Sequence, residues 1–285
     1  MLAVATEGVS VYTRTIAVFV ACVITSLIST YAQQVPAEDR HGNTLRILSY
    51  NIKRGYGMDS KTDIGRAAAV INRLKPDLVA LQEVDVGVRR SGWVDQTVEL
   101  GRLTQTTPFF AEFMDHDGGK YGQGLLSRLP VLQVRRIPLP DGQEEPRASA
   151  VMRVRAFGEE LTIACVHFYR TEEDRLAQAR ALVAAMADVE GPVVLAGDFN
   201  SRRGDPVMTL IEQSFESPVK QGPPNTFRSD NPRTEIDFIA FRPKDAFTVK
   251  EYRVVSAPVV SDHLPVLMVL ERVSARLDKT PKEIR

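Results

Sequence analysis

Runs of apolar residues separated by polar turns recur along the chain from residue 45 to residue 271. Runs of four to eight apolar residues bounded by Gly, Pro, Asp or Asn are typical of strands. Apolar residues spaced three and four apart, with polar residues between them, are typical of amphipathic helices. The pattern predicts that strands outnumber helices.

Three helices are predicted. DIGRAAAVINRLKPD begins at Asp63, a residue that can cap a helix, and Pro76 lies just past its end. TEEDRLAQARALVAAMADV has acids in its first turn, where they favour the helix dipole, and residues 97–106 form a shorter helix. Strands are predicted at LRILSYNI, LVALQEV, FFAEF, YGQGLLS, PVLQVRRI, ASAVMRVRAF, LTIACVHF, PVVLAG, IDFIAF and LPVLMVLE.

This order of elements fits an α/β protein with two packed sheets and helices outside. A chain of 285 residues has room for one large α/β domain or two small ones. No linker follows residue 45, so we predict one catalytic domain over residues 45–272. Residues 33–44 are polar and predict a linker, and residues 273–285 form a charged tail.

The first 32 residues differ from the rest. No charged residue lies between Arg14 and Glu38, and residues 16–28 are mostly apolar. A basic residue, an apolar stretch and a small residue at the exit indicate a secretory signal, cleaved after Ala32. The alternative is an uncleaved membrane anchor, since the uncharged stretch is near the length that spans a bilayer. We therefore expect a secreted or periplasmic protein, or one held at the membrane by this segment.

Charge and cysteine content narrow the function. Lys plus Arg and Asp plus Glu both number 36, so the chain lacks the basic surplus typical of nonspecific nucleic-acid binding. Only two cysteines exist, and removal of the leader with Cys22 leaves Cys165 without a partner. Cys165 lies in an apolar run, so we expect a small buried residue and no nucleophile.

Polar side chains gather where the predicted strands end. Asn51 ends LSYN, Glu83 ends VALQE and His167 ends IACVH. Three further stretches complete the set, with Asp198 and Asn200 in LAGDFN, Asp237 in TEIDF, and Asp262 and His263 in SDH. Each alone could be a turn or capping residue. Together they supply oxygen ligands for a metal and acid–base groups, without a thiolate.

At these residues the chain resembles the endonuclease/exonuclease/phosphatase superfamily. The matching stretches are SYNIKRG, LQEVD, YGQGLLSR, EPRASAVMRV, VHF, LAGDFN, TEIDFI and SDHLPV, in the family's order over about residues 45–271. The resemblance implies a four-layer α/β/β/α sandwich, in which two mixed β-sheets pack face to face with helices outside. It also implies cleavage of a phosphoester that depends on Mg²⁺, with Mn²⁺ as the alternative ion.

Phosphoester hydrolysis builds negative charge on the phosphorus oxygens, and a bound Mg²⁺ stabilises that charge. Glu83 is the best predicted ligand, because Mg²⁺ favours carboxylate and carbonyl oxygens. The resemblance places Asn51 beside it, and Asp262 is expected to join directly or through water. Lys53 stands where some members have a second acid, which favours one metal over two; it could contact phosphate or be a solvated lysine.

The attacking water needs a base or an orienting group. Asp198 and the Asp237–His263 pair are nearly equal candidates, and Asp237 would orient the imidazole. Asn200, on the same side of an extended chain as Asp198, would donate its amide to a phosphoryl oxygen. His263 and His167 would hold the phosphate and move protons, and we expect His263 at the mouth of a strand and outside the core.

The sequence leaves the roles of three further positions open. Arg147 in EEPRAS resembles the family's arginine that faces the site and binds phosphate, and the alternative is an ordinary surface arginine. Gln123 stands where many members have Asn, so that residue's role is not transferred. Trp93, the sole tryptophan, is either a loop anchor or a recognition residue.

The substrate is set by loops and does not follow from the fold. A neutral, exported enzyme favours a small phosphoester or a lipid head group, and we expect a monomer. A nuclease acting on DNA or RNA is the alternative, although the loops contain no long basic or aromatic insertion. A catalytically inactive binding module is a third interpretation, and the intact set of buried charges speaks against it.

Overall fold

The computed structural model describes residues 43–273. The predicted signal or anchor over residues 1–32 therefore lies outside the described residues, as do nearly all of the predicted linker and tail. The first strand begins at Thr44, one residue before its predicted start. None of the helices within residues 43–273 is long and apolar enough to cross a membrane.

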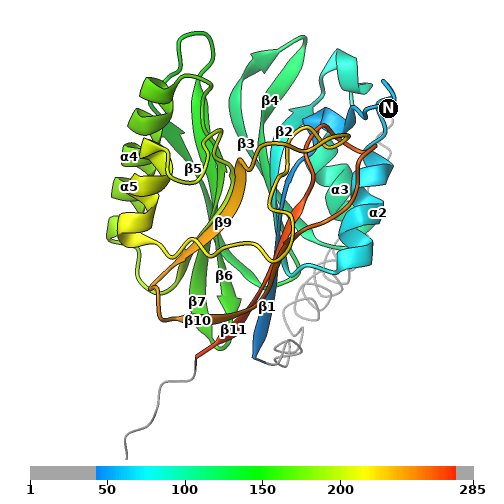
Figure 1. Cartoon of the computed structure of the whole chain (residues 1–285). Helices are drawn as coiled ribbons and strands as arrows, with labels where there is room; N and C mark the ends of the chain where they lie inside the picture. The colour runs from blue at the N-terminus through cyan, green and yellow to red at the C-terminus, as the bar shows by residue number, and fades with distance from the viewer. Residues whose placement is uncertain (1–42, 274–285) are drawn as a thin grey trace, which may run out of the picture. The chain divides into compact units, whose positions relative to one another are not determined.

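Eleven strands within the described residues form two sheets (Figure 1). In the first sheet only β1 and β2 run parallel, and the other neighbours are antiparallel. Its order is β10 (Phe247–Val254), β11 (Val266–Arg272), β1 (Thr44–Asn51), β2 (Leu78–Val86), β4 (Gly119–Ser127) and β3 (Thr107–His116).

The second sheet has the same mixed character, because only β7 and β8 run parallel. Its order is β5 (Val131–Leu139), β6 (Arg147–Ala156), β7 (Glu159–His167), β8 (Val193–Asp198) and β9 (Asp237–Arg242). Strands β1, β2, β7 and β8 are buried on both faces, which explains their nearly continuous apolar runs.

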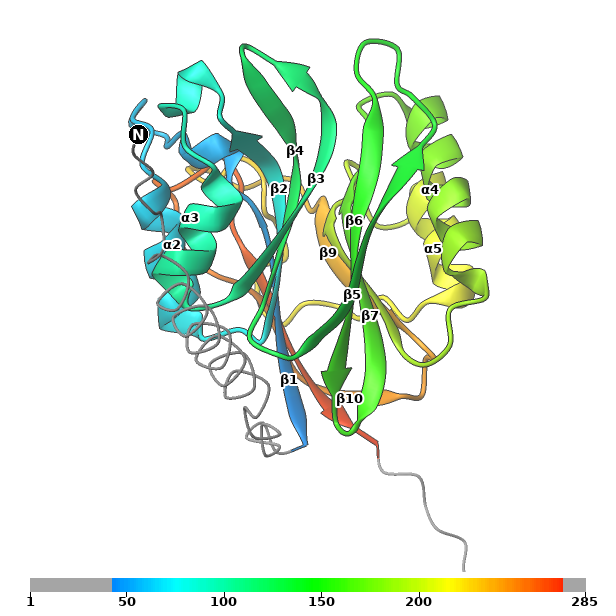
Figure 2. The ribbon, with the colours of Figure 1, turned by 180° about the vertical axis from the view of Figure 1, so that it is seen from behind.

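Helices cover the outer face of each sheet (Figure 2). Helices α2 (Ile64–Leu74) and α3 (Gln96–Thr104) pack on the first sheet, and α4 (Glu172–Ala187) and α5 (Pro206–Ser214) pack on the second. Between the sheets lies a third apolar core with side chains from both. The predicted four-layer sandwich is confirmed.

The helix starts follow the predicted capping chemistry. The Asp63 carboxylate accepts a hydrogen bond from Gly65 N at 2.9 Å, one residue into α2. Thr171 caps α4, whose first turn carries three acids. The predicted helix over residues 97–106 is α3, which begins at Gln96 after the capping residue Asp95.

Candidate active site

Three of the predicted site residues stand in a row across the second sheet. The strand register places His167 opposite Asp198, and Asp198 opposite Asp237. Residues opposite each other on neighbouring strands project from the same face. All three side chains are at least 90% buried, so this row is enclosed between the sheets and not solvated at a surface.

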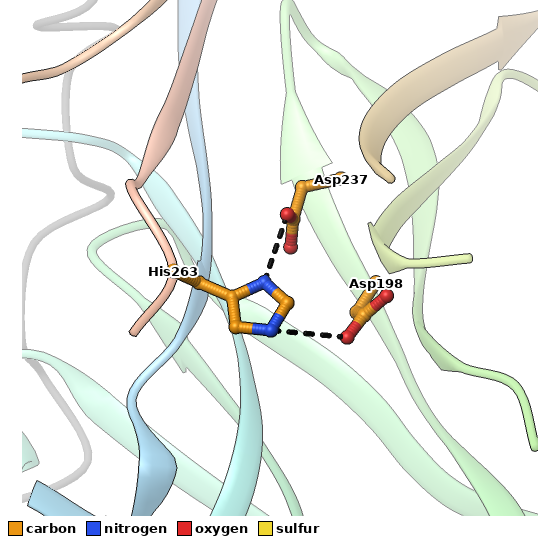
Figure 3. Close-up of side chains that lie close together, drawn as sticks. All are labelled: Asp198, Asp237 and His263. Atoms are coloured by element: carbon orange, nitrogen blue, oxygen red, sulfur yellow. Dashed lines mark hydrogen bonds and ion pairs between the residues drawn. The ribbon is translucent and has the colours of Figure 1, made fainter. Parts of the chain in front are cut away.

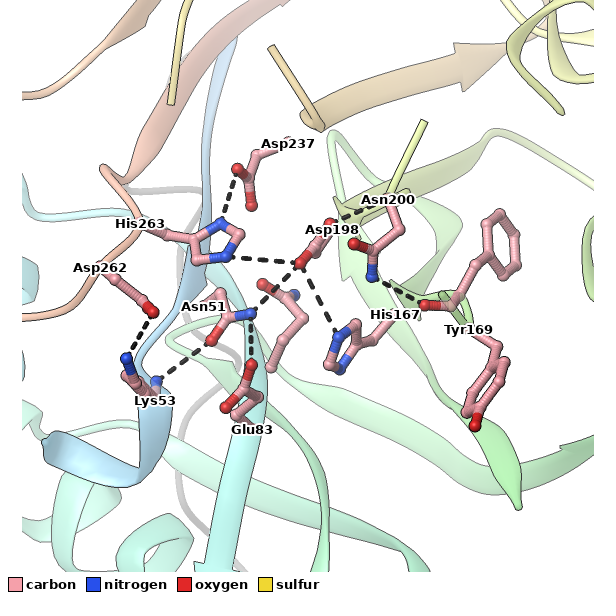
Figure 4. Close-up of polar contacts among 12 residues, drawn as sticks. Asn51, Lys53, Glu83, His167, Tyr169, Asp198, Asn200, Asp237, Asp262 and His263 are labelled. Atoms are coloured by element: carbon pink, nitrogen blue, oxygen red, sulfur yellow. Dashed lines mark hydrogen bonds and ion pairs between the residues drawn. The ribbon is translucent and has the colours of Figure 1, made fainter. Parts of the chain in front are cut away.

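The first sheet faces this row with Asn51. The Asn51 amide nitrogen donates to Glu83 Oε1 at 3.1 Å and to Asp198 Oδ2 at 3.3 Å (Figure 4). Asn51 is the last residue of β1, and Asp198 is the last residue of β8. The amide therefore joins the two sheets at the edge where their parallel strands end.

Glu83 does not end a strand as predicted. Strand β2 continues to Val86, and its register with β4 shifts between Leu81 and Val84. Glu83 has φ +57° within this irregularity, a conformation that side chains adopt at a cost. The bulge turns the carboxylate toward Asn51, where the regular alternation of a strand would direct it elsewhere.

His263 completes the group from the segment before β11. Its Nδ1 lies 2.9 Å from Asp237 Oδ2, and its Nε2 lies 3.6 Å from Asp198 Oδ2 (Figure 3). His167 approaches Asp198 Oδ2 from the other side at 3.7 Å. The expectation that His263 lies outside the core is wrong in one respect, because the residue is only 5% exposed and packs against Phe227 at 4.9 Å.

Burial and neighbouring charges give the three groups different protonation states. Burial raises the pKa of Asp198 to about 7, although the His263 charge opposes the rise. Burial also acts to lower the pKa of His263, but the Asp237 and Asp198 carboxylates outweigh it and raise the pKa to about 10. Burial, Arg147 and His263 hold the pKa of His167 well below its usual range. At neutral pH His263 is charged and His167 is neutral.

These shifts predict that the metal-free protein loses stability as pH rises. The pKa of His263 is about 10 in the fold against 6.5 ordinarily, so its contribution is complete below pH 6.5 and lost toward pH 10. The pKa of Asp198 is about 7 in the fold against 3.8 ordinarily, so stability falls as pH rises from 3.8 to 7 and the loss is complete above pH 7. Melting temperatures in EDTA should fall from pH 6 to pH 10, less steeply for His263→Asn. Equal slopes for both proteins would contradict the assignment.

The donor set at the Asn51 edge fits a divalent cation. Glu83 carries a carboxylate and Asn51 an amide oxygen, the donor types that Mg²⁺ and Mn²⁺ favour. The Asn51 amide nitrogen donates to Glu83, so the two side chains are in contact, and the Asn51 oxygen accepts from Lys53 N. Asp198, Asp237 and His263 also offer ligand atoms within 4.8 Å of one another. The His263 imidazole, which is charged, already engages Asp237 Oδ2 and faces Asp198 Oδ2, although Asp237 Oδ1 has no partner among the described residues. A cation there would meet that positive charge, so Glu83 and Asn51 are the better place for it.

The third predicted ligand, Asp262, has a different partner. Its Oδ2 lies 2.5 Å from Lys53 Nζ, and Lys53 N donates to Asn51 Oδ1 at 3.1 Å. The Lys53–Asp262 pair stands beside Asn51 in Figure 4. A cation held by Asp262 would compete with this ammonium group. The structure therefore brings Asp262 to the edge of the site, next to a positive charge.

The geometry expected for Asn200 is wrong. Its φ is +48°, so the chain is not extended there, and Asn200 N donates to Asp198 Oδ1 at 2.8 Å. Its amide nitrogen donates to Phe168 O at 2.9 Å, which ties the turn after β8 to the end of β7. Asn200 thus holds Asp198 in place, and one of the two N–H groups of its amide is engaged by Phe168 O.

Arg147 is a buried residue, and the surface alternative is excluded. Its side chain is 4% exposed, and its guanidinium lies 5.0 Å from the Phe113 ring and 5.2 Å from the Tyr169 ring. One nitrogen pairs with Glu145 at 2.9 Å. The positive charge of Arg147 lowers the pKa of His167, so the guanidinium acts on the groups of the site.

Gln123, to which the sequence analysis gave no role, holds the backbone beside His167. The Gln123 amide, in the orientation that satisfies both ends, donates to Cys165 O at 2.8 Å and accepts from His167 N at 2.9 Å. It links β4 to β7, so it fixes the backbone of His167. The sequence offered only one signal, a glutamine inside the strand-like run YGQGLLS, and the structure buries that side chain fully. Cys165 itself is buried, and burial raises the pKa of its thiol to about 12, as expected of an inert residue.

A cavity of about 480 Å³ lies elsewhere, lined by residues that include Thr162 and Gly191. Thr162 pairs with Val193 at the start of β8, whereas His167 pairs with Asp198 at its end. Five residues of strand separate the two ends by roughly 16 Å. The cavity contains none of the residues described above, so we do not place the chemistry there.

The comparisons with known proteins agree with this arrangement. The model of the Endonuclease/Exonuclease/phosphatase family matches residues 48–263, most of the chain. The chain belongs to this family. Its members are hydrolases that act on phosphoesters and generally depend on a divalent metal, in line with the buried cluster of acids and histidine. The comparison with curated proteins found no match.

Solved structures show the same fold at low sequence identity. An endonuclease/exonuclease/phosphatase from Beutenbergia cavernae is 24% identical, with a TM-score of 0.67 over 81% of this chain and 72% of that one. The human Nocturnin catalytic domain is 19% identical, with a TM-score of 0.64 over 81% and 95%. A mannosyl-6-phosphatase from Bacteroides thetaiotaomicron is 17% identical, with a TM-score of 0.65 over 79% and 99%.

Proposed function

We propose that the protein is a phosphoester hydrolase that uses Mg²⁺ or Mn²⁺ to cleave its substrate with water. The proposal rests on the surroundings of Asp198. Its carboxylate lies between the imidazoles of His167 and His263, and it accepts a hydrogen bond from the Asn51 amide nitrogen. Burial leaves its pKa about 7, within the range of a general base at neutral pH.

Each neighbour of Asp198 then has a role. Asp198 takes the proton of the attacking water as oxygen bonds to phosphorus and the ester oxygen leaves. His263, charged and oriented by Asp237, stabilises the negative phosphoryl oxygens and can protonate the leaving oxygen. The buried positive charge of Arg147 supports the phosphoryl group from the side of His167.

Glu83 and Asn51 would hold the divalent cation, whose contribution is to neutralise charge on the phosphoryl oxygens. The side chains of these residues reach the site from the first sheet, whereas Asp198 and His167 come from the second. The rigid contact between the sheets through Asn51 keeps the ligands and the acid–base groups in register. A single metal is favoured, since Lys53 brings a positive charge to this edge.

For the substrate we propose a small phosphoester or a lipid head group outside the cytoplasm. The balanced charge, the apolar leader and the similarity to a mannosyl-6-phosphatase support this class. A nuclease is the second candidate, because the family includes endonucleases and exonucleases. A panel decides between them, with bis-p-nitrophenyl phosphate, mannose 6-phosphate, sphingomyelin, phosphatidylinositol and plasmid DNA, each with Mg²⁺. Cleavage of DNA alone would reject the small-substrate proposal, and no cleavage would favour a binding module.

Export is proposed from the leader, and it makes a separate prediction. Mass spectrometry of the native protein should find the N-terminus near Gln33, because the small residue Ala32 precedes it. Fractionation gives the control. An intact Met1 in the membrane fraction would favour the anchor, and an intact Met1 in a soluble cytosolic fraction would reject export.

A further inference from the structure

Tyr121 lies on the inner face of strand β4, two residues before Gln123, the residue that fixes the backbone of His167. Side chains two residues apart on a strand face the same side, so Tyr121 and Gln123 share a face. Gln123 bonds to the backbone of Cys165 and His167 in the opposite sheet, which identifies that face as the inner one. Tyr121 is therefore one strand repeat, roughly 7 Å, farther along the same face.

Aromatic contacts connect Tyr121 to the catalytic group. The Tyr121 and Phe113 rings meet edge to face at 5.8 Å, and the Phe113 ring lies 6.3 Å from that of His167. The Arg147 guanidinium lies 5.0 Å from the same Phe113 ring. A single phenyl ring thus separates Tyr121 from two residues assigned to the phosphoryl group.

The Tyr121 hydroxyl has no hydrogen-bond partner among the described residues, although the side chain is only 9% exposed. The hydroxyl oxygen itself reaches solvent, so a ligand can approach it. Burial and the charge of Glu83 hold the pKa of Tyr121 well above its usual range, so the hydroxyl keeps its proton and can donate. Tyr121 pairs with Asp85 on β2, two residues beyond Glu83, so the neighbouring strand carries the proposed metal ligand.

A second donor beside Tyr121 lacks a partner as well. Arg147 Nε is buried and makes no hydrogen bond to the described residues, while Nη1 is held by Glu145 and Pro146 O. The unpaired Arg147 N–H and the phenol O–H belong to side chains that both contact the Phe113 ring, and each can donate to a ligand. A phosphoryl group supplies several acceptor oxygens and the negative charge that suits Arg147.

We propose that the Tyr121 hydroxyl donates a hydrogen bond to an oxygen of the bound phosphoryl group, beside Arg147. The inference rests on the proposed function, because it assigns a further contact to the same site. Tyr121 contributes a neutral donor close to Glu83, so it orients the phosphoryl group without competing with the cation.

Tyr121→Phe tests the contact, since it removes the hydroxyl and keeps the ring that packs on Phe113. The melting temperature should be unchanged, and kcat/KM should fall by about 10- to 100-fold, the range for a lost hydrogen bond to a charged group. Calorimetric titration with inorganic phosphate, in the presence of Mg²⁺, should show a similarly weakened Kd. This second readout does not depend on the identity of the substrate.

Tyr252→Phe is the matched control, because its hydroxyl accepts from Ile239 N at 2.9 Å inside the core. It should lower the melting temperature and leave phosphate binding unchanged. Wild-type kinetics and wild-type phosphate affinity in Tyr121→Phe would overturn the inference and leave the proposed function intact. A wild-type protein that neither hydrolyses any phosphoester nor binds phosphate would overturn both.

Discussion

Replacement of His263 by asparagine should lower kcat by about 10²–10⁴, the range typical of a lost acid–base group. Asparagine can still donate to Asp237, whose carboxylate would otherwise be left buried and unpaired. It cannot carry the charge that faces Asp198 at 3.6 Å, nor transfer a proton there. The kcat is measured per folded molecule, with the melting temperature recorded for each variant.

If His263 were only structural, its loss would lower the melting temperature and leave kcat per folded molecule unchanged. The residue packs against Phe227 and is nearly fully buried, so His263→Ala should also destabilise the protein, unlike a change at a solvated strand end. Glu99→Gln, which changes a surface side chain that pairs with Arg102 on α3, is the control and should leave kcat unchanged. Loss of stability in His263→Asn with wild-type turnover would remove His263 from the chemistry.

The partner of His263 gives a further test of the pair. Asp237→Asn should lower kcat as well, because an amide no longer favours the imidazole orientation and charge that the carboxylate stabilises. The double variant should cost less than the product of the two single effects, since the two side chains act as a unit. Strictly multiplicative losses would indicate that the two residues act independently.

The polar residues at strand ends were predictable for a physical reason. Parallel β7 and β8 end at the same edge, so His167 and Asp198 had to be neighbours once both strands were recognised. Asn51 ends β1 at the facing edge of the other sheet by the same logic. Apolar runs that stop at a polar residue therefore predicted most of the site residues and the packed sheets that hold them.

The remaining features depend on geometry that periodicity does not encode. A bulge directs Glu83 into the site from within β2, and an αL conformation turns the Asn200 amide toward Phe168. The pair of Lys53 and Asp262 joins residues 209 positions apart, and no local pattern relates them. Local sequence predicted which residues matter here, whereas tertiary contacts decided what each side chain does.

Metal removal should have an effect as large as the loss of His263. EDTA should abolish phosphoester hydrolysis, and Mg²⁺ or Mn²⁺ should restore it, because a divalent cation at Glu83 and Asn51 would neutralise charge that the chain's own residues leave exposed on the phosphoryl oxygens. Glu83→Gln should reproduce the loss in the presence of Mg²⁺, since it replaces the one carboxylate of this pair by a neutral amide. Glu99→Gln is the matched control, because Glu99 pairs with Arg102 on the surface of α3.

A readout without substrate separates metal binding from catalysis. At a Mg²⁺ concentration of 100 times Kd, binding stabilises the folded state by about 2.7 kcal/mol. For a protein of this size, that corresponds to a rise of roughly 5–10 °C in melting temperature. The wild type and Glu99→Gln should show the rise, and Glu83→Gln should lose it. A full rise in Glu83→Gln would place the cation elsewhere, with Asp198, Asp237 and His263 as the next site to test. Full activity of the wild type in EDTA, with no metal found by elemental analysis, would reject metal dependence itself.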